Sequence, residues 1–218
     1  MLTKEEFTQL RDFIYEKTGI YFGDNKMYRM ENRLMNRLVE LGLSSFGDYY
    51  LYLKFGNERA RNEILNLFDA VTTNETSFFR NREQFDAFRT IIINEYLKDG
   101  INTFYGLRIW SAACSTGDEP YTIAIVLMEI MEALKKNLLF SIYATDISPQ
   151  VLESAKRGIY SEYNLRAVDE SIKSKYFSVT RDKNYRIKEE VKRFVRFDFM
   201  NLMDEDAYRL YRNMDIIF

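Results

Sequence analysis

The chain has 218 residues, of which 46% are hydrophobic and 29% charged, and its formal net charge is −2. This composition indicates a folded globular protein of one large or two small domains, and the net charge gives no argument for binding nucleic acid. The absence of histidine excludes histidine-based metal sites and Ser–His or Cys–His nucleophile pairs, and no metal site is expected.

The sequence predicts neither a membrane span nor a signal peptide. No apolar run approaches the roughly 18–20 residues that span a bilayer, and the N-terminus, MLTKEEFTQL, has the pattern of an amphipathic helix. The single cysteine, Cys114, cannot form an internal disulfide. We therefore expect a cytoplasmic protein in a reducing compartment, with no direct membrane insertion.

Residues 1–75 predict an all-helical domain. Apolar residues recur there at helical spacing, and Gly19, Gly42 and Gly56 stand where helices are expected to end. The expected helices lie at about 7–17, 26–41, 45–55 and 64–71.

From about residue 80 the pattern changes to alternating helices and strands. This order predicts an α/β fold with a parallel, doubly wound sheet, with Trp110 in its core and a small antiparallel hairpin around residues 181–184. The expected elements are a helix over 81–100 closed by Gly100, a strand over 107–113, a helix over 118–135, a strand over 140–145, a helix from Ser148-Pro149 and a buried strand over 214–218.

The segment LRIWSAACSTGDEPY (107–121) predicts a strand, a tight turn and the start of a helix. Small residues around Gly117 make a turn that could admit a ligand, although a plain strand–helix turn has the same composition. Asp118 is expected to favour the helix start, where an acid complements the dipole.

Asp146 follows the strand over 140–145, at the edge where open α/β sheets bind ligands. A helix-capping role is the alternative. Because Ser148 and Pro149 already supply a cap and a first helical residue, we interpret Asp146 as a carboxylate for ribose hydroxyls.

The segment VTTNETSFFR (71–80) has two interpretations. Thr72 and Glu75 have the spacing of a capping box, which would make the following polar residues part of a surface helix. The alternative is a segment that lines an active site.

These motifs, with YATDISPQVLESAKRGIY (143–160) and RFDFMNL (196–202), resemble the chemoreceptor glutamate methyltransferases, the CheR family. The resemblance covers essentially all 218 residues. It implies transfer of a methyl group from S-adenosyl-L-methionine to glutamate side chains of bacterial chemoreceptors, with S-adenosyl-L-homocysteine as the product. It also implies a receptor-docking domain over 1–75 and a Rossmann-like methyltransferase domain over 76–218, with a β-subdomain at about 176–195.

The resemblance assigns roles to individual residues. Arg80 is expected near the transferred methyl group, where a bidentate pair would orient the substrate carboxylate. Asp146 matches the aspartate that holds the ribose, and Glu119 would meet the amino group of the cofactor. The full set of expected cofactor residues is Asn74, Thr76, Arg80, Gly117, Glu119, Asp146, Asn201 and Leu202.

A basic stripe is expected on the second helix, offset locally only by Glu31. A solvated helix face is the plain interpretation. The resemblance favours docking to the carboxylate-rich helical bundle of a chemoreceptor, and the short, glycine-free stretch 177–190 indicates a pentapeptide-independent member. The stripe consists of Lys26, Arg29, Arg33 and Arg37.

The chain also departs from the family pattern. It lacks the usual G-x-G-x-G of methyltransferases, and only three core strands can be counted, at 107–113, 140–145 and 214–218. We therefore expect a chain shortened at its C-terminus, and a non-catalytic module that binds the cofactor or a receptor is the alternative. A nicotinamide dehydrogenase is disfavoured, because the chain has no GxGxxG fingerprint.

Overall fold

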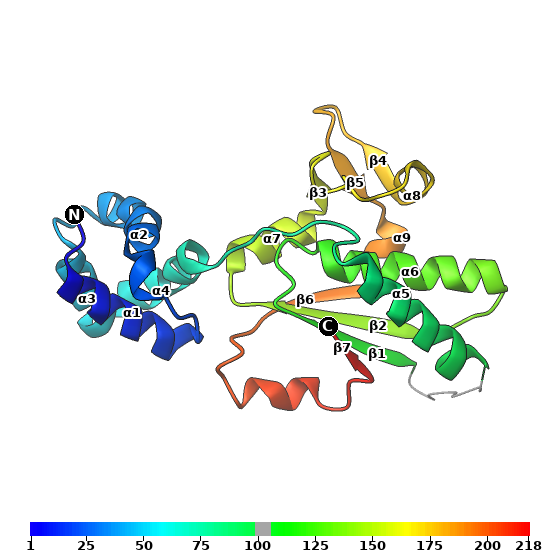
Figure 1. Ribbon diagram of the computed structural model, residues 1–218, viewed down its shortest axis with the longest axis horizontal. Coiled ribbons are helices and arrows are strands. Elements are labelled where there is room, and N and C mark those ends of the chain that lie inside the picture. The colour runs from blue at the N-terminus through cyan, green and yellow to red at the C-terminus, as the bar shows by residue number, and fades with distance from the viewer. Residues whose placement is uncertain (99–105) are drawn as a thin grey trace. The chain divides into compact units, whose positions relative to one another are not determined.

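The computed structural model describes residues 1–98 and 106–218 (Figure 1). The chain forms two compact units, each with its own hydrophobic core. The first comprises Met1–Thr73, Ile147–Pro149 and Met200–Tyr208, and the second comprises Asn74–Asp146, Gln150–Phe199 and Arg209–Phe218.

The first 73 residues are helical, as predicted. Thr3 and Glu6 form a capping box at the first helix, and Ser45 caps the third. Gly19 and Gly42 end the first two helices in the left-handed conformation, which glycine adopts without strain. The elements are α1 (Lys4–Thr18), η1 (Asp24–Lys26), α2 (Met27–Leu41), α3 (Phe46–Phe55) and α4 (Glu58–Val71).

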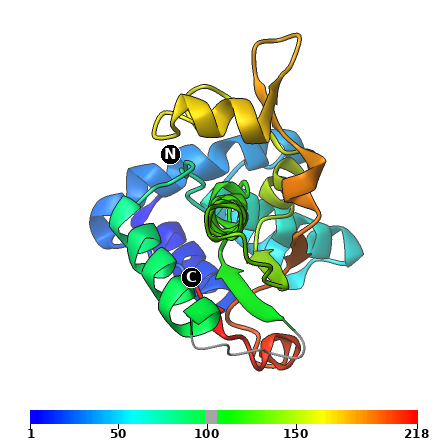
Figure 2. The same cartoon turned by 90° about the vertical axis from the view of Figure 1, so that its right-hand side faces the viewer.

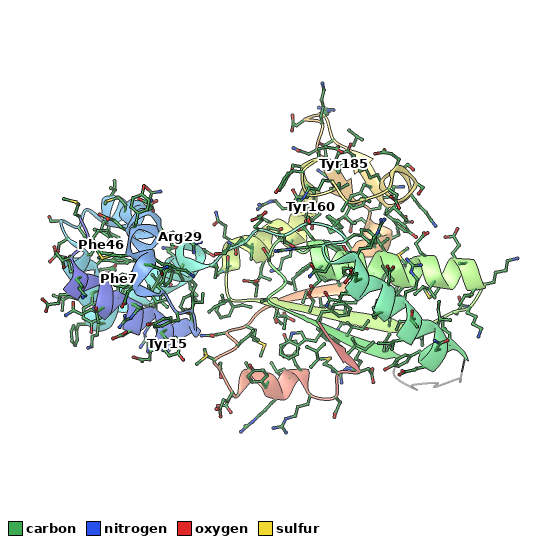
Figure 3. All side chains as sticks on the ribbon, in the orientation of Figure 1. Phe7, Tyr15, Arg29, Phe46, Tyr160 and Tyr185 are labelled. Carbon is green, nitrogen blue, oxygen red and sulfur yellow. The ribbon has the colours of Figure 1, made fainter. Side chains whose placement is uncertain are left out.

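The apolar faces of these helices form the core of the first unit. Phe7 of α1 and Phe46 of α3, both labelled in Figure 3, are 2% exposed. Met30, Leu34 and Leu38 contribute the matching row from α2. Packing of these faces, rather than helix propensity alone, stabilises helices of this length.

One carboxylate, Glu63 of α4, is buried in this helical core and is 2% exposed. The Arg37 guanidinium donates to both of its oxygens, at 2.9 and 2.7 Å, and Tyr49 Oη and Asn66 Nδ2 donate at 2.9 Å each. Burial pushes the pKa of Glu63 up, but the hydrogen bonds from Arg37, Asn66 and Tyr49 outweigh it and hold that pKa below its ordinary value.

A parallel sheet organises the second unit. Its described strands lie in the order β6-β2-β1-β7. Numbered along the chain among these four strands, the order is 3-2-1-4, which is the order at the centre of a Rossmann-type sheet. The strands are β1 (Leu107–Ala112), β2 (Phe140–Asp146), β6 (Val195–Phe199) and β7 (Ile216–Ile217).

Helices and a second, antiparallel sheet complete this unit. Figure 2, viewed nearly along α6, shows this helix over the strands with α5 beside it. The small sheet has the order β3-β5-β4, and its Tyr160–Tyr185 pair is labelled in Figure 3. The remaining elements are α5 (Arg82–Ile91), η2 (Ile92–Lys98), α6 (Asp118–Leu134), α7 (Pro149–Arg157), β3 (Ile159–Tyr160), α8 (Glu170–Tyr176), β4 (Phe177–Val179), β5 (Tyr185–Ile187), α9 (Glu189–Lys192) and η3 (Ala207–Tyr211).

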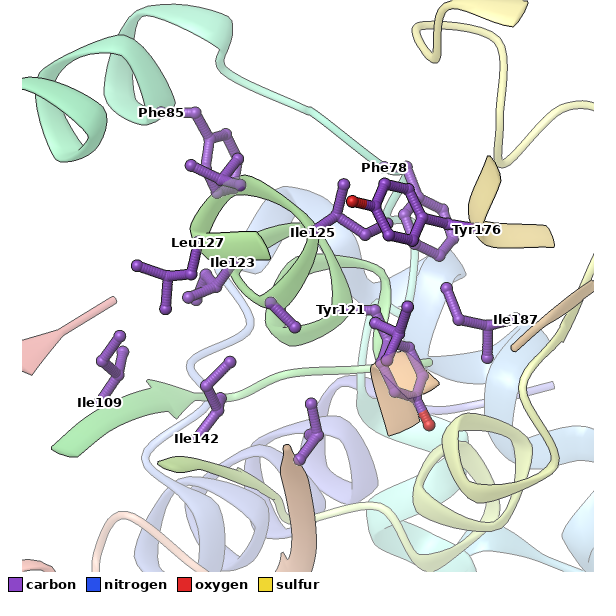
Figure 4. Packing of buried hydrophobic residues seen from close by; sticks show 14 of the residues in the cluster. Phe78, Phe85, Ile109, Tyr121, Ile123, Ile125, Leu127, Ile142, Tyr176 and Ile187 are labelled. Atoms are coloured by element: carbon purple, nitrogen blue, oxygen red, sulfur yellow. The ribbon is translucent and has the colours of Figure 1, made fainter. Parts of the chain in front are cut away.

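The two faces of the parallel sheet are covered differently. Ile109 and Ile142 face the apolar side of α6, where Ile123 lies (Figure 4). On the other face, Trp110 stacks on Tyr211 with ring centroids 5.1 Å apart, and Trp110 Nε1 donates to Thr145 Oγ1 at 2.9 Å. The prediction of Trp110 as a core residue is confirmed, since it is 5% exposed.

The parallel α/β sheet and the antiparallel insertion are confirmed, but the count of three core strands is wrong. β6 pairs in parallel with β2 over five residues. It was missed because it is an edge strand, in which only Val195 is buried and Arg196, Asp198 and Phe199 are exposed. β7 is also outermost, so Ile217 is 60% exposed and the expectation of a buried strand is wrong there. The predicted helix end at Gly100 lies outside the described residues.

Within residues 1–98 and 106–218, no helix is long and apolar enough to cross a bilayer.

We expect Arg37→Ala to lower the free energy of unfolding by about 3 kcal/mol at neutral pH, because it leaves the buried Glu63 carboxylate without its cation. Urea unfolding followed by far-UV circular dichroism measures this loss. Arg29→Ala, at an exposed position of the same helix (Figure 3), is the control and should change stability by no more than about 0.5 kcal/mol.

The loss in Arg37→Ala should also depend on pH. The lowered pKa of Glu63 contributes stability above the pKa of an unfolded glutamate, about 4.3, and this contribution disappears as the pH falls through the native pKa. The difference between wild type and Arg37→Ala should therefore shrink in acid. Equal losses in Arg37→Ala and Arg29→Ala at neutral pH would contradict a stabilising Arg37–Glu63 pair.

Candidate cofactor site

The site begins at the turn between β1 and α6. Ala113, Ser115 and Gly117 have positive φ angles of 61°, 49° and 87°. Every second residue of this turn is therefore in the left-handed region, which makes the turn tight. A Cβ on Gly117 would lie 2.9 Å from Cβ of Ala155. Gly117 therefore allows close packing against α7, and its contact with the cofactor stays a prediction.

Asp146 is the last residue of β2 and is 7% exposed. Its Oδ2 accepts a hydrogen bond from the Ser115 amide at 2.8 Å, and the Cys114 amide donates to the Thr145 carbonyl at 2.9 Å. The turn after β1 thereby fixes a carboxylate at the C-terminal edge of the parallel sheet, where such sheets bind ligands.

Glu119, in the first turn of α6, supplies a second carboxylate. Its Oε1 accepts from Ser111 Oγ of β1 at 2.7 Å. Burial raises the pKa of Glu119, and the bond from Ser111 opposes this only in part.

Cys114 is a buried free cysteine in the turn between β1 and α6. Burial raises the pKa of its thiol, and the negative charges of Asp146 and then Glu119 raise it further. The thiol stays protonated at neutral pH, which excludes Cys114 as a thiolate nucleophile.

The capping-box interpretation of Thr72 and Glu75 is wrong. α4 ends at Val71, and Thr72 Oγ1 donates back to the Phe68 carbonyl at 3.0 Å. The next helix begins only at Arg82. Thr72 therefore closes one helix rather than opening another.

The segment 74–80 is hydrogen-bonded to the turn and to α6. Ser115 Oγ donates to the Asn74 carbonyl at 3.1 Å, and the Phe79 amide donates to Thr122 Oγ1 at 3.2 Å. The Phe78 ring is fully buried and packs edge-to-face on Tyr160, with centroids 4.8 Å apart. These contacts bring the predicted active-site segment to the loop that holds Asp146.

Arg80 is exposed, and its Nη1 donates to the Glu75 carbonyl at 2.8 Å. Asn74 and Thr76 are partly buried in the same extended segment. The structure thus brings Asn74, Thr76 and Arg80 together with the elements that carry Glu119 and Asp146.

Sequence reasoning missed the burial of Asp118. It is the first residue of α6, as expected, but it is fully buried and accepts from Thr116 Oγ1 at 2.6 Å and from Asn164 Nδ2 at 3.0 Å. Burial raises its pKa. Acidic residues are common in the first turn of exposed helices, so the sequence around Asp118 does not indicate that its side chain is buried.

Asn201 and Leu202 belong to the first unit. The Asn201 side-chain amide donates to the Lys17 carbonyl at 2.6 Å, and the Leu202 carbonyl accepts from Tyr208 Oη at 2.6 Å. Both residues remain predicted contacts of the adenine region.

Two of the four predicted docking residues bind within the first unit. The Arg33 guanidinium donates to the carbonyls of Val71 and Thr72 at the end of α4, and Arg37 binds Glu63 and Glu40. Lys26 and Arg29 are exposed.

The expectation that only Glu31 offsets this stripe is wrong, because Arg37 pairs with Glu40 and Glu63. Glu31 Oε1 accepts from the Leu2 amide at 3.0 Å and lies 3.9 Å from the chain's amino terminus.

A separate cavity of about 360 Å³ lies between α5, α6 and residues 167–172. None of the predicted cofactor residues lines it. The candidate site therefore rests on hydrogen-bonded residues at the edge of the sheet and not on this cavity.

The two carboxylates of the site, which accept hydrogen bonds, fit a cationic cofactor that carries a ribose. Asp146 can accept from ribose hydroxyls, and Glu119 can pair with an ammonium group. A dinucleotide fits poorly, because its pyrophosphate would meet the Glu119 carboxylate at the start of α6.

Comparison with known proteins agrees with this pair of carboxylates. Residues 5–72 match the family described as "CheR methyltransferase, all-alpha domain", and residues 74–218 match "CheR methyltransferase, SAM binding domain".

Three curated relatives cover the whole chain. The chain is 35% identical over 218 residues to the chemotaxis protein methyltransferase of Borreliella burgdorferi, and 34% identical over 220 residues to chemotaxis protein methyltransferase 2 of Vibrio cholerae. It is 33% identical over 220 residues to the chemotaxis protein methyltransferase of Salmonella typhimurium. The alignments span 100% of this chain and 76%, 74% and 72% of the three relatives.

With two carboxylates fixed at the edge of the sheet and both family domains matched in order, the chain belongs to the CheR methyltransferase family, with S-adenosylmethionine as its cofactor.

Proposed function

We propose that this protein methylates glutamate side chains of bacterial chemoreceptors in the cytoplasm and forms glutamyl methyl esters. The observation that carries the proposal is the attachment of the Arg80 segment to the turn that holds Asp146 and to the helix that carries Glu119. The relatives named chemotaxis protein methyltransferases support the same process.

The proposed reaction requires little acid–base chemistry. S-adenosylmethionine, when bound, supplies a methyl group on a positively charged sulfur. A glutamate is already ionised at neutral pH, so no residue has to remove a proton from it. The protein contributes positioning and partial exclusion of water, which a chain without histidine can provide.

Each predicted residue has a part in this positioning. Arg80 binds the acceptor carboxylate through its planar guanidinium. Asp146 holds the ribose and Glu119 holds the amino group of the cofactor. Asn74 and Thr76 contact the cofactor from the segment before Arg80, and Asn201 with Leu202 contacts the adenine region.

We assign receptor docking to residues 1–75 and methyl transfer to residues 76–218. The exposed Lys26 and Arg29 supply the docking charges most directly, because Arg33 and Arg37 also bind within the first unit. Charges of this kind act mainly on association rate and salt dependence. The short turn between β4 and β5 supports docking without a receptor pentapeptide.

The proposed function is tested by incubating the chain with labelled S-adenosylmethionine and a purified chemoreceptor cytoplasmic fragment. Glutamyl methyl esters hydrolyse in mild alkali, so the transferred label should be released as methanol. Arg80→Ala should lower the rate at least about 100-fold, since the acceptor carboxylate loses its bidentate partner.

Two other results of this assay would decide against the proposal. Label that resists alkali would indicate another acceptor group. Binding of S-adenosylhomocysteine without any transfer would indicate a non-catalytic module.

Asp146→Asn should weaken S-adenosylhomocysteine binding at least about tenfold by calorimetry, because a neutral amide replaces the carboxylate that accepts from the ribose. The asparagine oxygen can still accept from the Ser115 amide, so thermal stability should change little. Asp182→Asn, at the exposed turn between β4 and β5, is the control. An unchanged affinity of Asp146→Asn for S-adenosylhomocysteine would contradict the proposal that Asp146 binds the ribose.

The raised pKa of Glu119 predicts pH-dependent cofactor binding. As the pH falls from about 7 to about 5, Glu119 takes up a proton earlier than an ordinary glutamate and loses its attraction for the ammonium group. The affinity for S-adenosylhomocysteine should fall over this range in wild type, and Glu119→Gln should bind weakly with little pH dependence. A wild-type affinity that is constant with pH would argue against this contact.

A further inference from the structure

The loop over residues 161–168 joins β3 to α8 and has no part in the assignments above. Its inner side is firmly held. Leu165 is fully buried, and the Asn164 carbonyl accepts from the Phe78 amide at 3.0 Å. The Asn164 side chain donates to buried Asp118 and accepts from Ser161 Oγ at 2.7 Å. The loop is therefore fixed to the segment that carries Arg80 and to the start of α6.

The outer side of this loop presents a stacked tyrosine and arginine. Tyr163 is 59% exposed, and the centre of the Arg166 guanidinium lies 4.0 Å from its ring centroid. Arg166 Nη1 also donates to the Tyr163 carbonyl at 2.7 Å. These contacts hold an exposed guanidinium in one orientation, which lowers the entropy lost when it binds a partner.

Glu75 links this pair to Arg80. Tyr163 Oη donates to Glu75 Oε1 at 3.3 Å, and Arg80 Nη1 donates to the Glu75 carbonyl at 2.8 Å. Arg80, Glu75, Tyr163 and Arg166 thus form one continuous exposed surface within the second unit. Only Glu75 among the four is acidic, and its carboxylate accepts from Tyr163.

We propose that Tyr163 and Arg166 are acceptor-binding residues, and that Arg166 binds a second carboxylate of the acidic protein segment whose glutamate is held by Arg80. This inference rests on the proposed function, because it takes Arg80 as the centre of methyl transfer. A solvated Tyr–Arg pair is the plain alternative. The attachment of this pair to Glu75 and the fixed loop behind it favour a binding role.

The test compares Arg166→Gln with Arg181→Gln, which removes the same charge from the exposed turn between β4 and β5. With a purified chemoreceptor cytoplasmic fragment as the acceptor, Arg166→Gln should raise the acceptor KM about fivefold. Added salt should reduce this difference. The kcat and the affinity for S-adenosylhomocysteine should stay at the wild-type values, and Arg181→Gln should match wild type throughout.

Direct binding of the same fragment, measured by calorimetry with S-adenosylhomocysteine present, separates this inference from the proposed function. Weaker binding by Arg166→Gln in a chain that transfers no methyl group would overturn the proposed function and retain the acceptor surface. Equal binding and equal KM for Arg166→Gln and wild type would overturn the surface and leave the proposed function intact. If Arg181→Gln weakened acceptor binding as much as Arg166→Gln, the loss would be a general effect of charge, and this would also overturn the proposed acceptor surface.

Discussion

The hydrogen bond from the Ser115 amide to the Asp146 carboxylate is the contact on which the second unit's site depends. It exists because β1 and β2 pair in parallel up to Ala112 and Thr145, so that Asp146, the next and last residue of β2, lies beside the turn that follows β1. The turn after β1 therefore starts beside the end of β2. Gly117 completes this arrangement, because the missing side chain lets the start of α6 approach α7. Segment 74–80 then has a fixed turn and a fixed helix to bind.

A buried carboxylate of the helical unit and a partly buried one of the second unit have different surroundings. In the helical unit, Glu63 is surrounded by donors that include the Arg37 guanidinium, and its pKa is lowered. In the second unit, Glu119 accepts from a neutral serine hydroxyl and its pKa is raised. A cation within the protein satisfies the first acid. In the part of the chain that the structure describes, the second has no cation among its hydrogen-bond partners, which is why we propose it as the residue that binds the ammonium group of the cofactor.

Most of the fold could be predicted from local sequence signals, because those signals act over a single helix or strand. Gly19, Gly42 and Ser45 mark helix ends through backbone conformation or one side-chain hydrogen bond. β1 and β2 are central strands and carry the apolar runs expected of them. β6 lies at an edge and carries the exposed charged residues Arg196 and Asp198, so its sequence lacks the continuous apolar run that indicates a central parallel strand.

The parts of the site that escaped prediction depend on contacts between distant segments. The sequence around Asp118 looks like that of any helix with an acid in its first turn. Its burial depends on contacts with residues such as Asn164, which is distant in the sequence and donates to its carboxylate. Arg37 occupies the same stripe as Arg29, yet a glutamate on another helix binds it. The capping-box pattern at Thr72 was wrong because α4 continues to Val71, so the threonine bonds to the preceding turn.

The segment over 150–194 enters and leaves the parallel sheet at neighbouring strands, since β2 and β6 are paired. It can therefore lengthen, shorten or change its surface without altering the order of the core strands. The exposed turn between β4 and β5 lies within this segment and far along the chain from Ser115 and Asp146, so its sequence can change while the hydrogen bond that holds the Asp146 carboxylate stays in place.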